Sequence, residues 1–266
     1  MSKVKLLNYS NKLPTLKEWT KHFRYRNSIA PRVTVGSLEA AEKGFKALNL
    51  KKVENMTAVE INPGLGAWTT ALRNNGFKRI IALEPQNAYL NWMEGLSALS
   101  DGKIEVVKKD GYTWDTYNCL KDDTKYIGSL ENKDWSQVHS ELFFTGTLPK
   151  TTNGERLLAQ FTGCITNKMA MHTLGRIQMA FWMTDVLYKK LAAPPGSNGR
   201  CKMSVVAEAC AEVKSIYVPE VEEMYPNGEY RLVHIIPTAE TEWDTFEYVL
   251  KHLFVMQRHP LRRVIR

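Results

Sequence analysis

A short apolar run followed by a glycine-containing turn carries the first chemically informative residues of the chain. Residues 57–62 form a predicted buried strand, and the motif Glu60-Ile61-Asn62-Pro63-Gly64-Leu65-Gly66 leads from it into a predicted helix over 67–75. Glycines at such a turn let the backbone approach a ligand, and the first turn of the helix offers N–H groups that lack intrahelical partners. Candidate ligand contacts here are Glu60, Asn62, Gly64 and Gly66.

Two further acidic residues follow the next predicted strands. Glu84 comes directly after residues 79–83, and Asp110 lies just beyond residues 103–108. A carboxylate at the end of the second strand can accept hydrogen bonds from both ribose hydroxyls of a nucleoside. Asp110 could then face an adenine amine, so that the strand ends would form a pocket for S-adenosylmethionine. The alternative is that these acids are ordinary surface residues.

The elements that must position these residues alternate between apolar strands and helices of 3.6-residue period. This alternation predicts an α/β protein with a parallel sheet, and two neighbouring C-terminal strands predict an antiparallel end. Seven such strands match the class I, S-adenosylmethionine-dependent, Rossmann-like methyltransferase fold. The predicted strands are 57–62, 79–83, 103–108, 140–145, 176–183, 214–219 and 230–237, and the predicted helices are 37–50, 67–75, 154–165, 186–193 and 242–257.

Three regions follow from this pattern. We expect a basic N-terminal segment over 1–34, the Rossmann-like domain over 35–240, and an amphipathic helix with a basic end over 241–266. No apolar stretch is long enough to predict a membrane span, and the four cysteines have neither the Cys-x-x-Cys spacing nor the histidines of a zinc site. The sequence therefore predicts no membrane association and no metal.

The net charge of +8 indicates a partner that carries phosphates. Much of the excess lies in the first 34 residues, where a basic run suits a mitochondrial import signal or a nucleic-acid contact. A solvated basic surface is the competing interpretation. The candidate nucleic-acid contacts are Arg24, Arg26, Arg176, Lys189, Lys190, Arg200, Lys202, Arg262 and Arg263.

The motif that begins at Glu60 resembles motif I of the rRNA adenine dimethyltransferases, which usually reads Glu-Ile-Gly-Pro-Gly-x-Gly-x-Leu-Thr. This chain has Asn62 in place of the first glycine. A second block has two parts: the segment from Ala193 to Ser197 is similar to the family's Ala-x-Pro-Gly-Ser motif, and the segment from Met203 to Val205 is similar to its Leu-Ser-Val motif. The resemblance spans roughly residues 23–263 and implies the methyltransferase fold.

The end of the fourth predicted strand departs from that family. Active members carry Asn-Leu-Pro-Tyr, in which the asparagine holds the target amine and the tyrosine ring stacks on the flipped adenine. Here the corresponding residues are Thr147, Leu148, Pro149 and Lys150. Loss of one positioned acceptor alone can lower a rate by about a hundredfold. We therefore expect a degenerate motif without a catalytic residue, in which Thr147 still borders the cofactor pocket.

Other segments resemble a nonenzymatic branch of the same superfamily, the fungal mitochondrial transcription factors. This resemblance implies a matrix protein that binds promoter DNA and a single-subunit RNA polymerase, helps to melt the promoter, and is a monomer outside that complex. The branch continues into a helical C-terminal domain, which we expect to be truncated or missing here. The segments are Asp110-x-Tyr112-x-Trp114-x-x-Tyr117, Cys164-Ile165-x-Asn167-Lys168, Gly175-Arg176-x-Gln178-Met179-x-Phe181-Trp182-Met183 and Arg200-Cys201-Lys202-x-Ser204-Val205-Val206.

Two alternatives remain open at this stage. The chain could be an rRNA adenine N6-dimethyltransferase that binds S-adenosylmethionine between Asn62 and Gly66. It could also be a catalytically inactive scaffold that binds RNA. The altered segment from Thr147 to Lys150 argues against the first alternative, and only a test of polymerase binding separates the second from a transcription factor.

Overall fold

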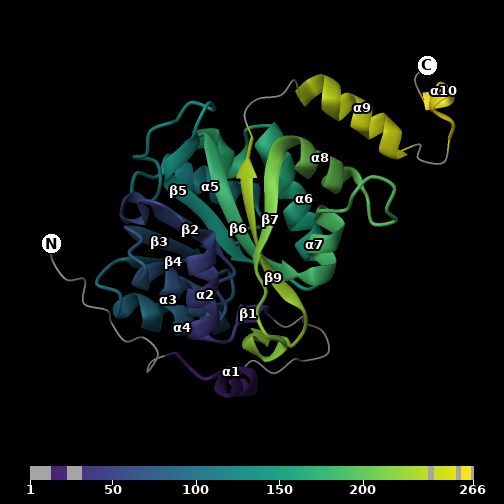
Figure 1. Cartoon of the computed structure of the whole chain (residues 1–266). Helices are drawn as coiled ribbons and strands as arrows, with labels where there is room; N and C mark the ends of the chain where they lie inside the picture. The colour runs from purple at the N-terminus through teal and green to yellow at the C-terminus, as the bar shows by residue number, and fades with distance from the viewer. Residues whose placement is uncertain (1–12, 23–31, 239–242, 256–258, 265–266) are drawn as a thin grey trace.

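Seven strands form the central sheet of the computed structural model, which describes residues 13–22, 32–238, 243–255 and 259–264 (Figure 1). Their order across the sheet is β4-β3-β2-β5-β6-β9-β7. The strands are β2 (Thr57–Ile61), β3 (Arg79–Leu83), β4 (Ile104–Val107), β5 (Val138–Thr147), β6 (Arg176–Thr184), β7 (Ala211–Tyr217) and β9 (Tyr230–Pro237).

The pairing directions match the sequence prediction. Strands β4, β3, β2, β5 and β6 are mutually parallel, whereas β9 lies antiparallel to both β6 and β7. Ile61 at the end of β2 lies in register with Leu83 on one side and with Gly146 on the other. The carboxyl ends of β2, β3 and β5 therefore meet at one edge of the sheet.

Helices cover both faces of the sheet and give three layers. Helices α2, α3 and α4 pack on one face, and α5, α6, α7 and α8 pack on the other. Their bounds are α2 (Leu38–Leu48), α3 (Ala67–Asn74), α4 (Asn87–Ala98), α5 (Trp114–Asp122), α6 (Thr152–Thr166), α7 (Asp185–Leu191) and α8 (Lys202–Cys210). Helices α4, α5 and α8 have no counterpart in the sequence prediction, since their apolar residues do not follow one clear stripe.

A small second sheet ties the N-terminal segment to the loop between β7 and β9. Strand β1 (Thr34–Val35) pairs antiparallel with β8 (Met224–Tyr225), next to the one-turn helix η4 (Val221–Glu223). Residues 226–228, Pro-Asn-Gly, have the composition of a tight turn between β7 and β9. In the structure, the loop between these strands is longer, its β8 pairs with β1, and Val33, Val35 and Met224 are buried there.

The amphipathic helix predicted over 242–257 is present as α9 (Trp243–Val255) and is followed by the short α10 (Leu261–Val264). Its Leu250 is buried against the α6 and α8 layer, with Trp243 and Phe246 partly buried beside it. The three-region division stays a prediction. Across the part of the chain that the structure describes, no helix has the length and apolar character to span a bilayer.

Aromatic rings fill the layer between the sheet and α6. The ring centroids of Phe144 and Phe161 lie 4.9 Å apart, and those of Phe161 and Phe181 lie 5.3 Å apart in a stacked arrangement. All three side chains are buried. Together they pack α6 against β5 and β6.

We therefore predict that Phe161→Ala lowers the free energy of unfolding by about 3–5 kcal/mol, the usual loss when a large core aromatic is truncated. Urea unfolding monitored by circular dichroism measures this change. Tyr248→Ala is the matched control, because Tyr248 is 65% exposed on α9, and its loss should change stability by less than about 0.5 kcal/mol. Equal effects of the two substitutions would contradict this account of the core.

Candidate functional site

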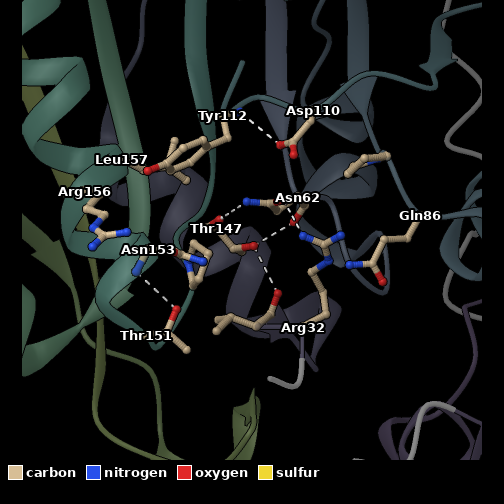
Figure 2. A pocket seen from close by; sticks show the side chains of 13 residues that line it. Arg32, Asn62, Gln86, Asp110, Tyr112, Thr147, Thr151, Asn153, Arg156 and Leu157 are labelled. Atoms are coloured by element: carbon tan, nitrogen blue, oxygen red, sulfur yellow. Dashed lines mark hydrogen bonds between the residues drawn. The ribbon is translucent and has the colours of Figure 1, made fainter. Parts of the chain in front are cut away.

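A cavity of about 550 Å³ opens at the edge where the parallel strands end. Three of the residues predicted for a cofactor pocket line it, namely Asn62, Asp110 and Thr147. Figure 2 shows Arg32 and Gln86 on one side of this cavity and Tyr112, Leu157 and Arg156 on the other. The topology therefore gathers polar groups from four strand ends and from the N-terminal segment.

The turn after β2 has the backbone that its glycines predict, but other parts of the chain fill the space beside them. Gly64 has a φ of +60° and Gly66 a φ of +89°. A Cβ on Gly64 would lie 2.5 Å from the side chain of Thr34, and one on Gly66 would lie 2.2 Å from Leu96 Cδ1. The Leu65 N–H donates to Thr34 Oγ1 at 2.7 Å. The close approach at Gly64 is thus made by strand β1.

Asn62 and Thr147 form a hydrogen-bonded link between β2 and β5. The Asn62 Nδ2 donates to the Thr147 carbonyl oxygen at 2.9 Å. The Thr147 hydroxyl lies 2.7 Å from the Asn62 carbonyl oxygen and 3.0 Å from the Val33 carbonyl oxygen, and it donates to them. The Thr147 side chain is therefore bonded to the chain's own backbone, and it is only 2% exposed.

Arg32 reaches into the cavity and pairs with the carboxylate that follows β3. Its Nη2 lies 2.7 Å from Glu84 Oε1, and its Nη1 donates to Asn62 Oδ1. The guanidinium also lies over the Tyr89 ring, with Cζ 5.1 Å from the ring centroid. Glu84 is completely buried, and burial raises its pKa while Arg32 lowers it.

Glu60 lies in the core and does not line the cavity. It shares a face of β2 with Ala58, and its side chain is fully buried near Thr69 of α3. Neither carboxylate oxygen has a well-formed hydrogen bond among the described residues. Burial raises the pKa of Glu60 to about 8, against a smaller opposing effect of the Thr69 hydroxyl. The group is therefore mostly protonated at neutral pH.

Side chains hold the loop after β4 in place, and two exposed aromatic rings lie on this loop and at the first residue of α5. Thr116 Oγ1 donates to the Asp110 carbonyl oxygen at 2.6 Å, and Tyr117 Oη donates to the Gly111 carbonyl oxygen at 2.6 Å. Tyr117 is buried, whereas Tyr112 is 39% exposed and Trp114 is 44% exposed. Asp110 is exposed at the cavity, where its carboxylate accepts from the Tyr112 N–H at 2.9 Å.

The end of β5 lacks the arrangement needed to hold an adenine. Pro149 lines the cavity and Leu148 is buried. Lys150 does not line it, and its Nζ donates to the Asn227 carbonyl oxygen at 3.4 Å. The four positions from Thr147 to Lys150 thus provide neither a side-chain amide nor an aromatic ring to the cavity.

The predicted nucleic-acid contacts are spread over the molecule. Arg24 and Arg26 lie outside the described residues, Arg176 begins β6 at the opposite edge of the sheet, and Arg262 and Arg263 are exposed on α10. The other four make ion pairs, which are Lys189 with Asp185 at 2.5 Å, Lys202 with Glu247 at 3.1 Å, Lys190 with Glu155, and Arg200 with Glu208.

Three cavity residues that sequence reasoning did not assign to the site are Arg32, Tyr112 and Arg156. Arg32 belongs to the basic N-terminal segment and Tyr112 to the aromatic segment after Asp110. The sequence therefore draws attention to both residues but does not place them at the cavity. Arg156 lies in the second turn of α6, is exposed, and makes no ion pair with any described residue. No cluster of metal-ligating side chains occurs in the ranges that the structure covers.

The sheet order and the strand-end cavity define a class I, S-adenosylmethionine-dependent methyltransferase fold. Solved structures agree. A dimethyladenosine transferase from Plasmodium falciparum superposes with a TM-score of 0.59 at 14% identity, covering 84% of this chain and 71% of that one. The 23S rRNA methyltransferase ErmE gives a TM-score of 0.53 at 14% identity, covering 85% of this chain and 84% of that one.

The chain belongs to the ribosomal RNA adenine dimethylase family, whose profile matches residues 38–266. It is similar to mitochondrial transcription factor 1 of Saccharomyces cerevisiae, with 26% identity over 84% of this chain and 73% of that protein. It is also similar to the human mitochondrial dimethyladenosine transferase 1, with 23% identity over 82% of this chain and 63% of that protein. The family resemblance stated from the motifs is confirmed.

The site residues do not fit S-adenosylmethionine in this arrangement. Of the two Glu84 oxygens that could receive ribose hydroxyls, Oε1 accepts from Arg32 at 2.7 Å and from the Gln86 N–H at 3.0 Å, and Oε2 is buried without a hydrogen-bond partner among the described residues. Asn62 takes the place of the first glycine of the turn. Its Oδ1 accepts a hydrogen bond from Arg32, and its Nδ2 donates one to the Thr147 carbonyl oxygen. No step of a methyl transfer therefore follows from these residues.

The buried Glu60 predicts a specific dependence of stability on pH. Its pKa of about 8 in the folded protein exceeds the ordinary 4.5, so the folded state retains the proton and stability falls as pH rises from 4.5 to 8. Burial lowers the pKa of His172 and His234 to about 4, which makes stability rise with pH below 6.5 and opposes Glu60 there. Histidines with lowered pKa values still lose protons in the unfolded chain just above pH 6.5, so the effect of Glu60 is isolated by comparing the protein with a Glu60 variant at each pH.

Relative to Glu60→Gln, we expect the free energy of unfolding of the unmodified protein to fall between pH 6.5 and 8 by up to about 1.4 kcal/mol per pH unit. Glu60→Gln keeps the side-chain size and removes this titration, while the histidines contribute equally to both proteins. Urea unfolding at pH 6.5, 7.2 and 8.0 provides the measurement. Parallel curves for the two proteins would show that Glu60 is ionised in the folded state.

Proposed function

We propose that this protein is a mitochondrial transcription initiation factor that helps a single-subunit RNA polymerase to recognise and melt promoters, and that it has lost methyl transfer. The protein is mitochondrial, as its named relatives are. Similarity to mitochondrial transcription factors over more than four fifths of the chain supports the transcription role.

The observation that carries the proposal is the end of β5. A dimethylase needs a side-chain acceptor for the adenine amine and an aromatic ring against the base. In this protein the Thr147 hydroxyl is bonded to Val33 and Asn62, and Lys150 reaches the Asn227 carbonyl oxygen outside the cavity. The fold of the enzyme is therefore kept while the groups that hold its substrate are absent from this edge.

Exposed aromatic rings beside the cavity suit an opened DNA strand. Tyr112 lines the cavity, Trp114 begins α5 just after the same loop, and Arg156 lies on the same side of the cavity as Tyr112 (Figure 2). Stacking of a base on such a ring contributes about 1–3 kcal/mol, and a nearby cation neutralises the backbone phosphate. Among the predicted contacts, the four cations in ion pairs would have to exchange a carboxylate for a phosphate, so they are weaker candidates than Arg262 and Arg263.

Run-off transcription tests the proposed function directly. The cognate polymerase is given a linear duplex promoter or the same promoter with a pre-melted bubble, with and without this protein. We expect transcription from the duplex to require the protein and transcription from the bubble to proceed without it. A lack of response on both templates would remove the main support for an initiation factor.

A substitution of Trp114, the exposed ring at the start of α5, makes this test more specific. We predict that Trp114→Ala lowers run-off transcription from the duplex by about 5- to 150-fold, which corresponds to the loss of about 1–3 kcal/mol of stacking on one base. The bubble template should be much less sensitive. Met169→Ala serves as the control, because Met169 is 45% exposed at the other end of α6. If both variants behave like the unmodified protein, Trp114 has no role in strand capture.

The second candidate function is rRNA adenine N6-dimethylation, which is favoured by the family assignment and by the retained cavity. A methyl-transfer assay with labelled S-adenosylmethionine and small-subunit rRNA tests it. We expect no transfer above a heat-denatured control. Stoichiometric labelling of adenine would make the chain an enzyme of this family, whatever its effect on transcription.

A further inference from the structure

Glu84, Asn62 and the Thr147 carbonyl group lie where a bound nucleoside would contact the protein. In this structure Arg32 and Asn62 join them by hydrogen bonds. Glu84 at the end of β3 pairs with Arg32 at 2.7 Å, and Arg32 in turn donates to Asn62. Asn62 continues the chain of contacts to the Thr147 carbonyl oxygen at 2.9 Å. The network crosses the carboxyl ends of β3, β2 and β5, which is the part of this fold where a nucleoside lies.

The charge pair at the centre of this network is shielded from water. The Glu84 side chain is fully buried, and the Arg32 side chain is only 11% exposed. An Arg–carboxylate pair gains more in such a place than at the surface, where water screens it. The Tyr89 ring beneath the guanidinium, 5.1 Å from Cζ, adds a favourable cation–π contact. Removal of the arginine would leave a buried carboxylate without a counterion.

The backbone that carries Arg32 is fixed at several points. The next residue, Val33, accepts a hydrogen bond from the Thr147 hydroxyl at 3.0 Å. Thr34 accepts from the Leu65 N–H at 2.7 Å, and strand β1 pairs with β8. Arg32 therefore lies two residues before β1, next to backbone that these contacts hold, and it reaches the turn that follows β2 through its hydrogen bond to Asn62.

We propose that Arg32 is a built-in occupant of the nucleoside half of the cavity. Its guanidinium donates to Glu84 Oε1 in place of a ribose hydroxyl and lies over the carboxylate, whose Oε2 is buried, so the protein excludes S-adenosylmethionine and related nucleosides. The other half of the cavity, beside Tyr112 and Arg156, keeps its opening (Figure 2). Arg32 is in this sense a residue that determines which ligands the fold accepts.

Isothermal titration of the full chain with S-adenosylhomocysteine, the demethylated form of the cofactor, tests the proposal. We expect no saturable binding of S-adenosylhomocysteine by the unmodified protein. Arg32→Ala should bind it, with an affinity at least about tenfold higher than that of the unmodified protein. Arg156→Ala is the matched control, since it removes a guanidinium from the same cavity without touching Glu84, and it should behave like the unmodified protein.

A double variant separates an opened site from a loosened one. Arg32→Ala combined with Glu84→Ala should lose the gained affinity, because the carboxylate that receives the ribose is gone. Circular dichroism verifies folding, and Arg32→Met, which keeps apolar packing on Tyr89, replaces the alanine variant if that variant unfolds.

Two outcomes would overturn the proposal. One is binding by the unmodified protein within tenfold of the Arg32 variants. The other is absence of binding by a folded Arg32→Ala or Arg32→Met protein, which would mean that other residues exclude the nucleoside. Since the titration contains neither polymerase nor promoter, its failure is independent of the proposed role in transcription.

Discussion

The parallel pairing of β2 with β3 on one side and β5 on the other is the constraint on which the rest of the site depends. This pairing sets Ile61 level with Leu83 and Gly146, so the residues that follow each strand meet at one edge. The backbone hydrogen bonds of three buried strands hold this edge rigidly. Side chains at the edge can therefore change their chemical role while the architecture stays the same.

The sheet and its direction could be predicted from the sequence because buried strands and their spacing leave a strong local pattern. The predicted strand over 79–83 has the observed bounds, and the antiparallel end formed by β6, β9 and β7 has the predicted sense. Helices α4 and α8 were not predicted because apolar residues occur on more than one side of each helix, so no single stripe stands out. The pairing of β1 with β8 was not predicted because a two-residue strand is too short to show an alternating pattern.

The site was predicted in outline, and its contacts were not. The positions of Asn62, Asp110 and Thr147 at the cavity follow from strand ends alone. The direction of Glu60 into the core depends on which side of β2 its side chain takes. The pairing of Arg32 with Glu84 joins residues 52 positions apart, and no local pattern records it. Likewise, lysines and arginines in the sequence predict a basic surface. In the folded chain, however, four of the predicted nucleic-acid contacts are paired with a carboxylate.

Asn62 couples the backbone of the turn after β2 to the position of Arg32. Its φ of +50° is one that glycine adopts easily and that asparagine tolerates better than most residues. The amide, however, joins Arg32 to the Thr147 carbonyl oxygen, and glycine would leave both without that partner. Asn62→Gly would therefore cost stability unless Arg32 changed as well. Positions 32 and 62 are thus expected to vary together, because a substitution at either one alone leaves a partner in the network unsatisfied.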